Sequence, residues 1–150
     1  MSTRTKLLAA VGALAALVLL LSRGGEESSA QLQALQDDPM ATYVPDGGTL
    51  VDTDSRNEGT SLGEPVSAQY TRMFELSAAA SARALEQARE AALAAGWTQP
   101  GTSGERGFLA ERRAPSGRLE LAVTEFRNSL LLPDDVTPPA LQVSLRHLGS

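Results

Sequence analysis

An unbroken apolar run near the amino end constrains this chain more than any other feature. Residues 7–21 read LLAAVGALAALVLLL, and basic residues stand just outside both ends of the run. A helix of this length rises about 23 Å, and its flanking residues can extend it toward the roughly 30 Å of a bilayer's hydrocarbon core. Because the run is apolar on every face, it predicts a membrane anchor over residues 7–22 and not a helix of a globular core.

The charges that flank this segment predict its orientation. Arg4, Lys6 and the amino terminus precede it, whereas Arg23 follows it. The positive-inside rule therefore places residues 1–6 in the cytoplasm and the rest of the chain outside the cell membrane.

A cleaved signal peptide is the alternative, because a basic start and an apolar stretch of this length also fit one. Ser28 and Ala30 have the small-residue spacing of a cleavage site, and a secreted mature chain would then begin at Gln31. Glu26 and Glu27 separate this pair from the apolar run, which makes the site a poor one. We therefore favour an uncleaved single-pass anchor.

The composition after the anchor narrows the classes of partner. From residue 24 onward there are ten arginines and eighteen acidic residues, a net charge of minus eight. Such a surface repels nucleic acid and anionic lipid unless the arginines cluster in three dimensions, so no nucleic-acid partner is expected. The chain has no cysteine, which excludes disulfides and thiolate sites. Abundant alanine, and arginine in place of lysine, are typical of GC-rich bacterial genomes and indicate a bacterial source.

The rest of the chain divides into a polar stretch and one domain. Residues 23–48 are predicted as a stalk or linker, in which Leu32 and Leu35 share one face of a short helix. Residues 49–150 are predicted as one extracytoplasmic α+β domain. Three or four mostly antiparallel strands form its small sheet, and one helix covers the sheet. The helical connection is long enough for a crossover, so a parallel pair between the strand that starts at residue 66 and a later strand is an alternative.

Apolar alternation and capping residues locate the elements of this domain. Alternation and turn signals predict strands over residues 49–53, 66–76, 108–114, 118–127 and 140–148. Ser77 as the amino-terminal cap and Gly96 as the stop predict a helix over residues 78–95 with a face of small apolar residues. Glycine, proline and serine predict loops over residues 54–65, 99–107 and 128–139.

Two side chains are candidate partner-binding residues. Arg72 interrupts the apolar face of the strand over residues 66–76, where it can extend to solvent, pair with a carboxylate or bind an anionic ligand. Trp97 follows the helix stop, where it either folds back over the core edge or, if exposed, forms a binding hot spot. We name Arg72 and Trp97 as possible contacts for a partner.

Catalytic and metal signatures are weak. His147 is the one histidine and a candidate general base, but no partner can be assigned to it, and we expect a partly exposed residue at a strand end. Asp52 and Asp54 match the start of a calcium loop, but Asn57 stands where that motif needs glycine and Gly63 where it needs glutamate. A solvated acidic loop is expected there, and no metal is predicted.

Charged residues in the predicted hairpin are expected to pair with one another. Glu111 and Glu120 lie near Arg112, Arg113 and Arg118, close enough to form ion pairs across the two strands. A charged solvent face would then explain these residues without any ligand.

The sequence contains no nucleotide-binding loop, nucleophile elbow or metalloprotease motif, and no cofactor is predicted. These observations predict a non-catalytic envelope protein, anchored in the membrane through residues 7–22, whose outer domain is an interaction or accessory module for an envelope protein partner. The alternative is a small-ligand-binding or enzymatic domain that uses Arg72, His147 or loop acids in a pocket. The alternative requires Arg72 or His147 inside a concave site.

Overall fold

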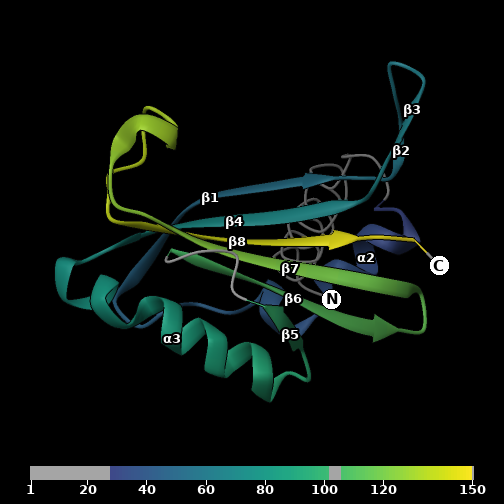
Figure 1. Cartoon of the computed structure of the whole chain (residues 1–150). Coiled ribbons are helices and arrows are strands. Elements are labelled where there is room, and N and C mark those ends of the chain that lie inside the picture. The colour runs from purple at the N-terminus through teal and green to yellow at the C-terminus, as the bar shows by residue number, and fades with distance from the viewer. Residues whose placement is uncertain (1–27, 102–105, 150) are drawn as a thin grey trace, which may run out of the picture.

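The computed structural model describes residues 28–101 and 106–149, and a six-stranded antiparallel sheet forms its centre (Figure 1). In spatial order the strands are β1 (Gly48–Arg56), β4 (Gln69–Leu76), β8 (Ala140–His147), β7 (Gly117–Phe126), β6 (Gly107–Ala114) and β5 (Thr98–Gly101). Every neighbouring pair is antiparallel. The α+β class is therefore confirmed, whereas the predicted count of three or four strands is wrong.

One long helix connects the interior strand β4 to the edge strand β5. The helix α3 (Ala78–Ala94) leaves β4 and delivers the chain to β5 at the far edge, after which β5, β6 and β7 follow one another in space. The last strand, β8, then enters between β4 and β7, so that the crossover creates no parallel pair.

The ends of α3 form as the sequence predicts. The Ser77 hydroxyl accepts a hydrogen bond from the Ala80 N–H at 3.1 Å and caps the first turn. At the other end Gly96 has a φ of +84°, and the Trp97 N–H donates to the Ala92 carbonyl at 3.0 Å. These bonds form a Schellman motif, in which glycine adopts the left-handed conformation at least cost.

The helical layer also contains the segment that the sequence assigns to a stalk. The helix α2 (Ala30–Gln36) and the 3-10 helix η1 (Pro39–Ala41) pack on β4 and β8, and Leu35 and Met40 are buried in the same core as α3. Residues 30–41 are thus part of the folded unit, because Leu32 and Leu35 find apolar partners on the sheet.

Alternation along the strands separates two faces of the sheet. On the covered face Phe74, Leu121, Val143 and Leu145 are buried against the helices. Three alanines of α3, at positions 84, 88 and 92, are fully buried, which lets the helix lie close to the sheet. The opposite face carries the intervening polar positions, and no α-helix of the described residues covers it (Figure 1).

Two stretches predicted as loops form short or edge strands instead. Residues 54–56 extend β1, and β2 (Gly59–Ser61) pairs with β3 (Glu64–Val66) in a separate ribbon. Residues 98–101 form β5 at the sheet edge. Among the described residues no helix is long and apolar enough to cross a membrane, and the predicted anchor over residues 7–22 lies outside these residues.

Candidate functional site

The face of the sheet opposite α3 has a polar hollow at its centre. Ala122 and Ser144 are neighbours on β7 and β8, and their short side chains leave space between longer neighbours. The hollow measures about 240 Å³. We call it and the residues that line it the open face: Gln69, Glu120, Ala122, Thr124, Gln142, Ser144 and Arg146.

Hydrogen bonds fix several side chains of the open face. The Ser144 hydroxyl lies 3.0 Å from the Thr71 hydroxyl, and the Gln69 amide donates to Ser144 at 3.1 Å. Arg56 donates to the Gln69 carbonyl oxygen at 3.2 Å, and Arg146 forms an ion pair with Glu120. The open face is therefore a set of ordered donors and acceptors that a partner's polar groups can meet.

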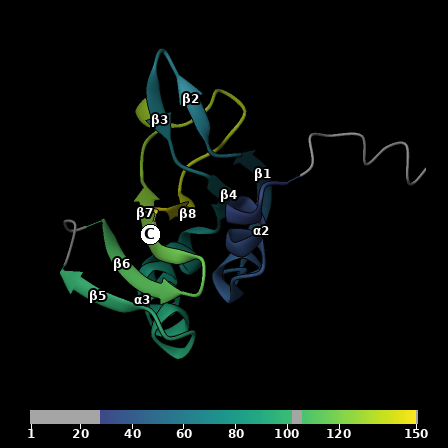
Figure 2. The ribbon, with the colours of Figure 1, turned by 90° about the vertical axis from the view of Figure 1, so that its right-hand side faces the viewer.

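Two projections rise beyond the ends of the open face, on the side away from α3 (Figures 1 and 2). We call them the two arms: the β2–β3 ribbon, and the 127–139 loop with its short 3-10 helix η2 (Ser129–Leu131). The loop is held on the sheet because Leu132 and Val136 pack against Met73 and Ala140.

The arms carry the three most exposed large apolar side chains among the described residues. Leu62, at the tip of the ribbon, is fully exposed at 104%, and Leu130 and Leu131 on the loop are exposed at 86% and 79%. Leu62 has a φ of +51° and Gly63 one of +85°, so the tip is a tight turn in which a leucine adopts a backbone conformation rare for it. Sequence reasoning did not single out these leucines, although Leu62 stands between serine and glycine, and Leu130 and Leu131 belong to a short leucine run before Pro133.

The open face carries hydroxyl, amide and charged groups. The Ser144 hydroxyl contacts Gln69 and the neighbouring Thr71 hydroxyl, and the Glu120 carboxylate is paired with Arg146. Across the described residues no three histidine, aspartate or glutamate side chains gather as metal ligands. Asp52 and Asp54 lie on the edge strand β1, opposite Met73 and Thr71.

Arg72 projects from the covered face of β4. Its Nη1 donates to the carbonyls of Ala41 and Tyr43, each at 2.9 Å, and its guanidinium lies 4.9 Å from the centre of the Phe74 ring. Arg72 thus connects the end of η1 and the segment after it to the sheet. This contact differs from the three that the sequence suggests, which are extension to solvent, pairing with a carboxylate and binding of an anionic ligand. Binding of a partner through Arg72 stays a prediction.

Trp97 folds back over the core, as the first of its two interpretations predicts. Its side chain is 1% exposed, and its indole N–H donates to Asp38 Oδ1 at 3.3 Å. Arg112 also binds the buried Asp38 carboxylate and stacks over the indole ring at 5.2 Å. Sequence reasoning missed this cluster, because residues 38, 97 and 112 are distant along the chain. The sequence analysis ties a hot-spot role to an exposed Trp97, and the side chain is buried in the folded domain. Partner binding through Trp97 stays a prediction.

His147 is buried at 1% exposure, so the expectation of a partly exposed residue is wrong. The Gly149 N–H donates to Nδ1 at 3.1 Å, so the ring proton is assigned to Nε2, which donates to the Ser116 carbonyl at 2.8 Å. The strand end does not fray because the Leu148 N–H still donates to the Arg118 carbonyl at 2.8 Å. Both ring nitrogens bind backbone, and His147 does not line the hollow of the open face.

A hollow of about 430 Å³ lies between α3 and residues 43–46. The Tyr43 hydroxyl is buried there and has no hydrogen-bond partner among the described residues. Burial raises the pKa of the Tyr43 phenol from 10.0 to about 12, and the Asp46 carboxylate adds to the rise. The folded state holds this proton more tightly than the unfolded chain, so the contribution to stability is complete below pH 10 and is lost as the pH rises toward 12.

We therefore expect alkaline pH to destabilise the protein partly through Tyr43. An absorbance titration of tyrosinate should show an ionisation near pH 12 in the native chain that is absent from Tyr43→Phe. The denaturation midpoint of the native chain should fall more steeply between pH 10 and 12 than that of Tyr43→Phe, by a modest amount because the phenol is only half buried. Equal slopes for the two proteins would contradict this expectation.

Comparisons of the chain with protein-family models, with curated proteins and with solved structures returned no match. The open face and its two arms are therefore interpreted from their own geometry. They combine ordered polar groups in the centre with exposed apolar groups at both ends.

Proposed function

We propose that this chain is a non-catalytic, membrane-tethered bacterial envelope protein whose outer domain binds a protein partner across the open face. The observation that carries the proposal is the exposure of Leu62, Leu130 and Leu131 at the tips of the two arms. Large apolar side chains held in water at loop tips gain about 1.5–3 kcal/mol each when a partner buries them. A polar centre between apolar contacts supplies register and specificity.

The contacts of Arg72 and His147 favour this function over an enzymatic or small-ligand domain. Arg72 binds two backbone carbonyls, and both ring nitrogens of His147 bind backbone. A catalytic role would require either side chain to give up these bonds and to face a concave site. Neither residue lines the open face.

The start of α2 supports an uncleaved anchor. Ser29 caps this helix by accepting from the Leu32 N–H at 3.1 Å, and its own N–H donates to Asn57 Oδ1 at 2.8 Å. Cleavage before Gln31 would remove the cap and free the base of the β2–β3 ribbon. Sequencing the amino terminus of the mature protein tests this point. A mature chain that starts at Gln31 would contradict the proposed membrane anchor.

Photo-crosslinking of the full chain in cells of its source tests the proposed partner. We expect a crosslinking residue at position 62 and one at position 131 to capture the same envelope protein, because the arms flank one surface. Leu93, which is 55% exposed on α3, provides the matched control on the other face. The substitution Leu130→Asp should reduce capture from position 62 without changing the fold.

Two results would contradict this function. Capture of the same protein from position 93 as from the arms would mean that contact does not depend on the open face. Products that contain lipid and no protein would mean that the arms touch a membrane surface instead.

A further inference from the structure

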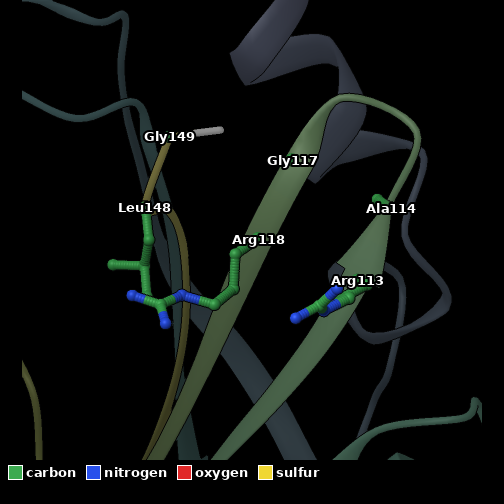
Figure 3. A pocket seen from close by; sticks show the side chains of 6 residues that line it. All are labelled: Arg113, Ala114, Gly117, Arg118, Leu148 and Gly149. Carbon is green, nitrogen blue, oxygen red and sulfur yellow. The ribbon is translucent and has the colours of Figure 1, made fainter.

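The register of the β6–β7 hairpin places two arginines directly opposite each other. Arg113 of β6 pairs with Arg118 of β7, next to the turn. Both side chains lie on one side of the hairpin, and that of Arg118 reaches toward Leu148 (Figure 3). They border a hollow of about 520 Å³, whose other lining residues are Ala114, Gly117, Leu148 and Gly149.

Backbone contacts hold the wall of this hollow in place. The Arg118 N–H donates to the Gly149 carbonyl at 3.0 Å, and the Leu148 N–H donates to the Arg118 carbonyl at 2.8 Å. Gly117 has a φ of +129°, and a Cβ at this position would lie 2.6 Å from the Gly149 carbonyl oxygen. Only glycine lets the segment after β8 approach the hairpin so closely.

Neither guanidinium has a partner inside the described part of the chain. The ion pairs and side-chain hydrogen bonds there involve other arginines. Glu120 binds Arg146, and Glu111 stands opposite Glu120. Like charges directly opposite each other destabilise an antiparallel pair, so an anion between the arginines would relieve a repulsion as well as gain two charged contacts.

We propose that Arg113 and Arg118 bind the phosphate group of an anionic ligand. Two guanidinium groups match a phosphate in charge, and each presents a planar fork of donors to its oxygens. The hollow is larger than one phosphate group, and Leu148 forms an apolar side of it. We therefore expect the phosphate to be part of a larger molecule. This is the clustering of arginines that an acidic chain needs before it can bind such an anion.

Phosphate titration of the full chain, followed by NMR at constant ionic strength, tests the site. We expect saturable shifts of the side-chain Nε–Hε signals of Arg113 and Arg118 with inorganic phosphate, and none with chloride. Arg113→Gln and Arg118→Gln should each weaken binding about fivefold, the loss expected for one exposed charged contact. Arg83→Gln, which changes the same charge on the exposed surface of α3, should leave it unchanged.

A second experiment distinguishes the two possible sources of the phosphate group. The full chain is placed in phosphatidylcholine bicelles, with and without phosphatidylglycerol. Shifts that need phosphatidylglycerol assign the site to a lipid headgroup, and shifts with inorganic phosphate in both bicelles assign it to a soluble phosphate compound. Shifts that chloride reproduces, or equal affinities for the native chain and both glutamine variants, would overturn the proposal and leave the proposed protein partner unaffected.

Discussion

Replacing Arg112 with alanine is expected to lower the free energy of unfolding by about 3–5 kcal/mol, because it leaves a buried carboxylate without its cation. The Asp38 side chain is fully buried, and Arg112 Nη2 donates to its Oδ2. Arg112 also donates to the Ala95 carbonyl at 3.0 Å and thereby joins β6 to the end of α3. Urea unfolding of the full chain, followed by far-ultraviolet circular dichroism, measures the loss.

The neighbouring Arg113→Ala provides the matched control. Arg113 is exposed and forms no ion pair with the described residues, so its removal should change the free energy of unfolding by less than about 0.5 kcal/mol. The double variant Asp38→Asn with Arg112→Met removes both charges and should recover part of the loss. Equal losses for Arg112→Ala and Arg113→Ala would show that the buried pair does not stabilise the fold.

The local elements with strong chemical signals could be predicted from sequence. Ser77 and Gly96 place the ends of α3 within one residue, because a hydroxyl cap and a left-handed glycine act on neighbours along the chain. Alternating apolar residues likewise locate β7 and β8, which are central strands with one buried face.

The edges of the sheet could be predicted only in part, because edge strands are not shaped by burial. The sequence predicts residues 49–53 of β1 as a strand. Residues 54–56 resemble a loop because they are polar and exposed, although they pair with β4. The β2–β3 ribbon stands apart from the core and has no apolar alternation. Its formation depends on the turn at Leu62 and Gly63.

The register of the β6–β7 hairpin differs from the charge pairing that the sequence predicts. Pairing of glutamate with arginine across the hairpin was expected, but the turn at residues 115–116 sets a register in which Glu111 faces Glu120 and Arg113 faces Arg118. The turn and the buried side chains of β7 set this register, and the attraction between exposed charges is too weak to change it. Compositional reasoning therefore cannot reveal the arginine pair.

Replacing Trp97 with alanine is expected to destabilise the fold by about 3–5 kcal/mol, because it opens a large cavity in the core. Trp97 is the largest of the fully buried side chains, and its ring is covered by the Arg112 guanidinium. The loss should exceed that of Leu93→Ala, an exposed position near the end of α3. Urea unfolding followed by circular dichroism is the measurement, since the variant lacks the only tryptophan.

Trp97→Phe separates the packing of this residue from its hydrogen bond and from any role with a partner. Phenylalanine keeps most of the buried ring but leaves Asp38 without the indole N–H, which predicts a smaller loss of about 1–2 kcal/mol. Capture of a partner from position 62, measured per folded molecule, should match that of the native chain because residue 97 is buried. Loss of capture in a stable Trp97→Phe protein would instead establish the indole as a partner contact.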